Sequence, residues 1–245
     1  MHPCISMQCF RNCSGGGLFP SPQRWRQECS NFTNYDVLMV PKTGSESLQF
    51  NMKKACPSTP RANTRFHTQL YSQCSVASLR DPCERLHSIF AHLKNKYPNK
   101  SMGVEWIDNA RSVDEFAVAV RDHWSEVRNH NTRDARSKRR DLILLQPQYL
   151  WIGNLSYIVC QNRLFADILR VAAELQCKNT NSISNATILP RILKDHKTKR
   201  LVKFANSSAQ YDAVAEFGRL SRHACLWTTH LYREDELLFS TYCRD

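Results

Sequence analysis

The chain has 245 residues, 42% of them hydrophobic, which supports one substantial core but not two. Its formal net charge of +12 indicates acidic partners, a condition that nucleic acids and acidic glycans both meet. No run approaches the roughly 18 apolar residues that cross a bilayer. No basic and apolar leader is visible either, so we expect neither a transmembrane segment nor a signal in this chain.

Cysteine and glycosylation patterns favour an oxidising compartment. The chain has eleven cysteines and six Asn-x-Ser/Thr acceptors, at Asn12, Asn31, Asn99, Asn154, Asn185 and Asn206. Eleven is an odd number, so at least one cysteine stays free or pairs between chains, and spacing does not reveal the pairing. No Cys-x-x-Cys pair is present, and we expect no metal site. The lumen of the secretory pathway, in particular the Golgi, or secretion is the predicted location.

Residues 1–34 show no periodic apolar pattern and contain cysteine, glycine and proline, so they predict an irregular N-terminal extension. Residues 35–245 are predicted to form a single catalytic domain.

The first motif lies where an apolar run, Tyr35 to Val40, meets Pro41-Lys42-Thr43-Gly44-Ser45-Glu46-Ser47. A strand that turns into a helix here would point backbone N–H groups and a helix N-terminus at one place, where they stabilise an anion. The order of residues differs from the common NTPase loop, in which Lys follows the second Gly. The structural alternative is an ordinary turn with Thr43 or Ser45 as the helix N-cap.

A second strand-to-helix junction follows about forty residues later. Ser75–Leu79 predicts a strand, and Asp81 with Pro82 predicts the N-cap and first turn of a helix. Arg80 is left at the end of the strand, and the helix can present Ser88 near it. A guanidinium fork and a hydroxyl form a phosphate clamp. The alternative is a structural ion pair between Arg80 and a nearby carboxylate.

Later segments complete a pattern of alternating strands and helices, which predicts a mostly parallel sheet with ligand loops at the carboxyl ends of its strands. Ser112-Val113-Asp114-Glu115 is a capping box that opens a helix. The other predicted elements are a strand over Leu155–Cys160 and helices over Leu164–Ala172, Tyr211–Leu220 and Arg233–Tyr242.

Two basic stretches lie outside these elements. One contains Arg128, Arg133, Arg136, Lys138, Arg139 and Arg140, and the other contains Lys194, His196, Lys197, Lys199 and Arg200. The first has no aromatic residues of the kind that stack on bases, and it is typical of a solvated loop. If it is functional, a chain bearing uronate or sulfate fits it better than nucleic acid.

Together the two phosphate motifs resemble the sulfotransferases that use 3'-phosphoadenosine 5'-phosphosulfate (PAPS), in particular the carbohydrate branch with uronyl 2-O-sulfotransferase-like enzymes. Pro41 to Leu48 is similar to the family's loop for the 5'-phosphosulfate. Leu79 to Phe90 is similar to its element for the 3'-phosphate. With looser matches later in the chain, the resemblance covers roughly Tyr35 to Cys243.

The resemblance implies an α/β fold with a P-loop-like central parallel sheet flanked by helices, with PAPS as donor and a glycan or glycoconjugate as acceptor. It gives Lys42 a catalytic role at the bridging oxygen of the donor. It implies that the 5'-phosphate is held by Thr43, Gly44, Ser45 and Ser47, and the 3'-phosphate by Arg80 and Ser88. It also implies that the late basic stretch closes over the donor.

The resemblance implies His67 as the base that accepts the acceptor's proton, because the family often has its catalytic histidine between the two motifs, and the pKa of histidine suits the task. The alternative is a structural histidine at this position. His87, His92 and Glu46 are secondary candidates. Glu46 also stands where the resembling family usually has a small or hydroxyl residue.

Two other functions stay open. One is a catalytically inactive sulfotransferase-like module that binds acidic glycans, which Glu46 beside the donor loop favours. The other is a nucleotide-dependent kinase, although the chain lacks Gly-Lys-Ser/Thr and an obvious acidic strand end for magnesium. The acceptor sugar and the oligomeric state do not follow from the sequence.

Overall fold

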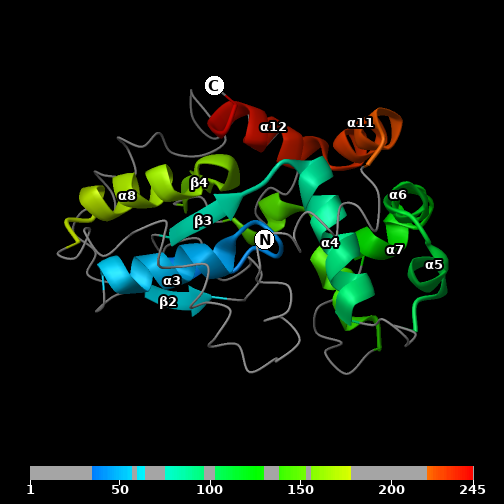
Figure 1. Ribbon diagram of the computed structural model, residues 1–245, viewed down its shortest axis with the longest axis horizontal. Coiled ribbons are helices and arrows are strands. Elements are labelled where there is room, and N and C mark those ends of the chain that lie inside the picture. Colours follow the sequence, from blue (N-terminus) through cyan, green and yellow to red (C-terminus); the bar gives the residue numbers. More distant parts are fainter. Residues whose placement is uncertain are drawn as a thin grey trace, which may run out of the picture.

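The computed structural model describes residues 35–56, 60–63, 75–96, 103–129, 138–152, 156–177 and 220–244. They form an α/β unit around a four-stranded sheet with the order β2-β1-β3-β4 (Figure 1). The strands are β1 (Tyr35–Leu38), β2 (Pro60–Asn63), β3 (Ser75–Leu79) and β4 (Ser156–Cys160). Every neighbouring pair is parallel, which confirms the predicted parallel sheet.

Both faces of the sheet are buried, as apolar strands of a parallel sheet require. Val37, Val76 and Val159 belong to one hydrophobic cluster, and their immediate neighbours Leu38, Ala77 and Ile158 belong to another. Alternate side chains of a strand point to opposite faces. The two clusters therefore fill the space on the two sides of the sheet.

Helices cover these two faces. The first cluster contains residues of α3 (Ser45–Ala55) and α8 (Leu164–Glu174), and these two helices contact each other. The second contains residues of α12 (Arg233–Tyr242) and of the short 3-10 helix η3 (Gln148–Trp151). A further 3-10 turn, η4 (Gln161–Arg163), connects β4 to α8.

A second group of helices packs beside the sheet, around α4 (Pro82–Lys96). Figure 1 shows α4 between the sheet and the helices at the right of the view. Leu86, Ile89 and Phe90 of α4 are buried in this cluster. Its other elements are α5 (Glu105–Asn109), α6 (Val113–Asp122), α7 (Trp124–Asn129), η2 (Lys138–Leu145) and α11 (Arg222–Leu231).

The predicted helix starts are confirmed by their caps. Asp81 Oδ1 accepts hydrogen bonds from the N–H groups of Cys83 (2.9 Å) and Glu84 (3.1 Å). Ser112 Oγ accepts from Glu115 N–H at 3.2 Å. β1 is shorter than predicted because the chain turns back after Leu38, where Val40 N–H donates to the Leu38 carbonyl at 3.0 Å.

Three disulfides join elements that are far apart in the sequence: Cys56–Cys177, Cys83–Cys225 and Cys160–Cys243. They link α3 to the end of α8, α4 to α11, and β4 to the end of α12. These bridges are compatible with a secreted or luminal protein. Within the segments that the structure describes, no helix is both long and apolar enough to span a bilayer.

Several predictions fall outside the described residues. These are the extension over residues 1–34, the base His67, all six glycosylation acceptors, the late basic stretch and the helix over residues 211–219. Of the first basic stretch, only Arg128 is described with its side chain, which is exposed.

We expect the Cys83–Cys225 bridge to stabilise the folded chain. It closes a loop with a sequence separation of 142 residues, and long loops lose the most unfolded-state entropy when they are closed. The Cys83→Ser/Cys225→Ser double variant should therefore lose about 2–5 kcal/mol of unfolding free energy. Urea denaturation under non-reducing conditions measures this loss, and an unchanged midpoint would contradict the role given to the bridge.

Candidate anion-binding site

The two predicted phosphate motifs lie side by side at one edge of the sheet. β1 pairs with β2 on one side and with β3 on the other, so the strand order reverses at β1. Pro41–Gly44 follows β1, and Arg80 follows β3. In open parallel sheets, ligands bind outside the carboxyl ends of the strands at such a reversal. The position of both motifs therefore matches the place where this class of fold binds its ligands.

The backbone of the first loop has the conformation of an anion-binding concavity. Lys42 has φ 63° and Gly44 has φ 87°, so left-handed residues stand on both sides of Thr43. Such alternation turns successive N–H groups toward one point. Within the described chain, the N–H groups of residues 42–45 donate no hydrogen bond, and α3 begins directly afterwards. The loop and the helix N-terminus thus leave a set of donors unused.

The hydroxyl groups of this loop stabilise the loop itself. Thr43 Oγ1 donates to the Val40 carbonyl at 3.0 Å and lies 2.7 Å from Ser78 Oγ. Ser45 Oγ donates to the same carbonyl at 2.9 Å. The alternative prediction of Thr43 or Ser45 as N-cap is wrong: the cap is Gly44, which has no side chain for the role. The groups that Thr43 and Ser45 leave for an anion are their backbone N–H groups.

Gly44 is favoured by the backbone conformation rather than by a lack of space. A Cβ atom at this position would meet Gln161 Cγ and Leu164 Cδ2 at 3.5 Å, which is ordinary van der Waals contact. Its left-handed φ, however, is costly for any residue with a side chain.

Lys42 is a half-buried cation at the mouth of this loop. Burial lowers the pKa of its ammonium group, and the nearby cations Arg80 and Lys96 act in the same direction, while Glu46 raises the pKa. Among the described residues, its Nζ forms no hydrogen bond or ion pair. A bound anion would offset both the cost of burying the ammonium group and its repulsion by Arg80 and Lys96.

Arg80 and Ser88 lie on the second strand-to-helix junction. Gln148 fixes the backbone of Arg80, since its side chain accepts from Arg80 N–H (3.0 Å) and donates to the Arg80 carbonyl (2.9 Å). The guanidinium Nε donates to Glu84 at 3.3 Å in an exposed pair. Within the described residues, the Ser88 hydroxyl makes no hydrogen bond. An anion can therefore replace Glu84 as the partner of Arg80. It can also accept a hydrogen bond from the Ser88 hydroxyl.

A buried arginine that sequence reasoning missed connects the two motifs. Arg85 Nε donates to the carbonyl of Pro41 in the phosphate loop at 3.0 Å. Its Nη2 donates to the carbonyls of Leu144 and Gln146, each at 2.8 Å. Arg85 lies on α4, so this side chain positions the first loop relative to the helix of the second motif.

The counter-ion of Arg85 is Asp235 on α12. The Asp235 side chain is fully buried, and its Oδ2 lies 4.0 Å from Arg85 Nη1. Its carboxylate also accepts hydrogen bonds from the N–H groups of Gln148 (2.7 Å) and Tyr149 (2.9 Å). Burial raises the pKa of Asp235 to about 6, against the opposite effects of Arg85 and of these N–H groups. The ion pair thus joins α4, η3 and α12 behind the site.

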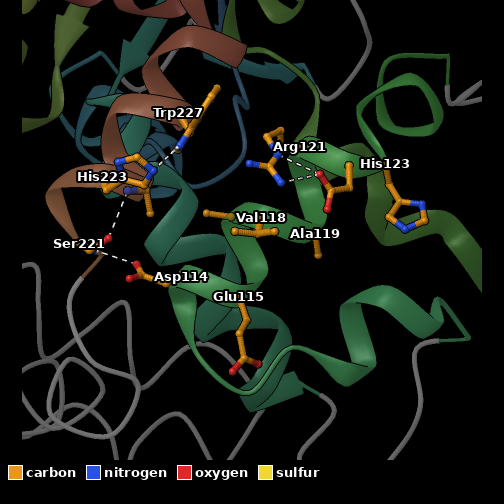
Figure 2. A pocket seen from close by; sticks show the side chains of 12 residues that line it. Asp114, Glu115, Val118, Ala119, Arg121, His123, Ser221, His223 and Trp227 are labelled. Atoms are coloured by element: carbon orange, nitrogen blue, oxygen red, sulfur yellow. Dashed lines mark hydrogen bonds and ion pairs between the residues drawn. The ribbon is translucent and has the colours of Figure 1, made fainter.

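A separate groove of about 520 Å³ lies between α6 and α11 (Figure 2). Its polar groups already bind each other: Trp227 Nε1 donates to His223 Nε2 at 2.8 Å, and the Asp114 side chain accepts from the backbone N–H of Ser221 at 2.8 Å. Arg121 pairs with Asp122 and lies over the Trp227 ring. Arg121 is therefore already engaged, and the groove is less suited to an anion than the loop at Lys42.

The described structure places the predicted residues Lys42, Thr43, Gly44, Ser45 and Ser47 on one loop and helix start. The charge of Arg80 acts on Lys42, and Ser88 lies one turn of α4 beyond Glu84, the ion-pair partner of Arg80. His67 lies outside the described residues. Sequence reasoning did not single out Arg85, although it belongs to the second motif. It also did not single out Lys96, which lies four residues after His92, as His92 lies four residues after Ser88. In the described chain, no group of three or more His, Cys, Asp or Glu side chains could hold a metal.

Comparison with known proteins adds no relative: no family model matches the chain, and no curated protein or solved structure is significantly similar to it.

Replacement of Arg85 tests its part in the fold. Arg85→Met leaves the Asp235 carboxylate buried without its counter-ion, so we expect a loss of about 3–5 kcal/mol of unfolding free energy. Arg121→Met, which removes an exposed ion pair with Asp122, should cost about 1 kcal/mol or less. Equal losses in urea denaturation of the two variants would contradict the role of Arg85.

Because of His92, we expect the folded chain to lose stability at acidic pH. Burial, then the charges of Lys42 and Lys96, lower its pKa from 6.5 to about 4, against a smaller opposite effect of Asp141. The unfolded chain therefore binds a proton more readily, and stability should fall as the pH drops from about 6.5 to about 4. His92→Gln should show a smaller fall over this window in urea denaturation. An identical pH profile would contradict the prediction.

Proposed function

We propose that the chain is a sulfotransferase that moves a sulfuryl group from PAPS to a hydroxyl of a carbohydrate acceptor. The observation that carries the proposal is the position of the two phosphate motifs at the carboxyl ends of the adjacent strands β1 and β3, at the reversal of strand order. Resemblance in sequence and position in the fold are independent, and they support the same ligand site. A P-loop-like fold is part of this proposal.

The donor would lie across both motifs. Its 5'-phosphosulfate would meet the unused N–H groups of the Lys42–Ser45 turn and the start of α3, where an anion is favoured. Its 3'-phosphate would meet Arg80 and Ser88, as the resemblance implies. The repulsion between Lys42 and Arg80 supports this arrangement, because a doubly phosphorylated ligand neutralises both cations.

Sulfuryl transfer places three demands on the site. The acceptor oxygen attacks sulfur, the bond from sulfur to the bridging oxygen breaks, and the acceptor's proton passes to a base. The products are the sulfate ester and 3'-phosphoadenosine 5'-phosphate. Lys42 is the cation beside the bridging oxygen, where it stabilises the developing negative charge. His67 stays the proposed base.

A catalytically inactive module that binds acidic glycans is the second candidate. It is favoured by Glu46, an exposed carboxylate in the first turn of α3 whose charge acts on Lys42. A carboxylate at this place repels the phosphosulfate and reduces the net charge of the loop. A nucleotide-dependent kinase is the third candidate. It requires that the chain bind ATP with magnesium in preference to 3'-phosphoadenosine 5'-phosphate.

Binding of 3'-phosphoadenosine 5'-phosphate, measured by isothermal titration calorimetry, tests the donor site. We expect micromolar binding by the wild-type chain. The Lys42→Ala and Arg80→Ala variants should each bind about ten- to a hundredfold more weakly, because each loses a hydrogen bond to a charged group. Lys53→Ala, an exposed lysine at the end of α3, is the matched control and should leave the affinity unchanged.

The outcomes separate the candidate functions. Binding that both site variants lose and the control keeps supports the donor site and justifies a screen of glycan acceptors for sulfate transfer from PAPS. Binding without transfer to any acceptor favours the inactive module. No binding by the wild-type chain, or a preference for ATP with magnesium, would overturn the sulfotransferase proposal.

A further inference from the structure

One side of α4 carries a row of polar residues at every fourth position: Glu84, Ser88, His92 and Lys96. Residues four apart lie above one another on a helix, so the row is continuous. It begins next to Arg80 and extends away from the second phosphate motif. Lys42 and Lys96 act on each other by charge, and Lys42 also acts on His92, so the far end of this row lies within electrostatic range of the phosphate loop.

His92 is a half-buried histidine in a cationic environment. The charged groups that act on it are Lys42 from the loop after β1, Lys96 from α4 and Asp141 from η2. Asp141 is already paired, because Lys96 Nζ donates to both of its carboxylate oxygens at 2.9 and 2.7 Å. Among the described residues, neither ring nitrogen of His92 makes a hydrogen bond or ion pair. The imidazole therefore keeps two unused nitrogens within electrostatic range of Lys42.

This environment holds the free imidazole neutral at physiological pH. Burial and the two lysines disfavour its protonated form, and they lower its pKa to about 4. An anion beside Lys42 changes both effects: it neutralises the ammonium charge, and it offers an acceptor for an imidazolium N–H. A charge-assisted hydrogen bond of this kind is among the stronger ones in proteins.

We propose that His92 is a further anion-binding residue of this site, and that it takes up a proton as the bisphosphate binds beside Lys42. The inference rests on the proposed function, since it requires a phosphate-bearing ligand in the loop. By linkage, a ligand that favours protonation of His92 binds more tightly as the pH falls. Besides Lys42 and Arg80, the site then has protonated His92 as a third cation only when the ligand is bound.

Proton uptake during binding tests the proposal. The probe is 3'-phosphoadenosine 5'-phosphate, titrated by calorimetry from about pH 5.5 to pH 8 in two buffers of different ionisation enthalpy. The proteins are the wild-type chain, His92→Gln and His230→Gln, an exposed histidine of α11 that serves as control. Protonation of the ligand's own phosphates is common to all three, so the difference between proteins reports on His92.

The wild-type chain and His230→Gln should take up as much as one proton more than His92→Gln at the acidic end. Their affinity relative to His92→Gln should rise by up to about tenfold per pH unit as the pH falls. Equal proton uptake by all three proteins would overturn the role of His92 and leave the donor site intact. Failure of the wild-type chain to bind would overturn both the inference and the proposed function.

A second measurement needs no variant of His92. The proton resonances of the histidine rings in the wild-type chain, followed by NMR across the same pH range, give the pKa of each ring with and without the bisphosphate. We expect the His92 pKa to rise on binding from about 4 toward the ordinary histidine value of 6.5. A pKa that stays near 4 in the saturated complex would overturn the proposal.

Discussion

The buried guanidinium of Arg85 is the interaction on which the candidate site depends. It binds the carbonyl of Pro41 in the phosphate loop and two carbonyls at the end of η2, and Asp235 of α12 balances its charge. Elements from the beginning, middle and end of the described chain are thus fixed to one side chain. A buried charge is costly unless it is paired and fully hydrogen-bonded, so these elements are held in one arrangement.

The same constraint places the two motifs at a fixed separation. The loop after β1 and the helix after β3 come from adjacent strands, and Arg85 joins the carbonyl side of the loop to that helix. The N–H groups of residues 42–45, Lys42 and Ser88 are left without partners in the described structure. A site built in this way has its binding groups ordered before the ligand arrives, which reduces the entropic cost of binding.

Local signals predicted the elements, whereas contacts between distant residues escaped prediction. Asp81 and Pro82 mark the start of α4 because capping depends on neighbours within three residues. The hydroxyl of Thr43 was assigned to a ligand or a cap, but it contacts Ser78, which only the pairing of β1 with β3 brings near. The partners of Arg85 and the pairing of Cys83 with Cys225 likewise require the tertiary structure. The position of His67 is not tested by the described residues.

We propose that a bisphosphate binds in the loop between β1 and α3, beside the start of α4. Backbone amide NMR of the isotope-labelled chain, titrated with 3'-phosphoadenosine 5'-phosphate, tests it most directly. We expect the largest shift changes at the amides of Thr43, Gly44 and Ser45, with further changes at Arg80 and Ser88 and little change at Trp227 in the α6–α11 groove. Saturable changes centred on that groove, with the Thr43–Ser45 amides unmoved, would contradict the claim.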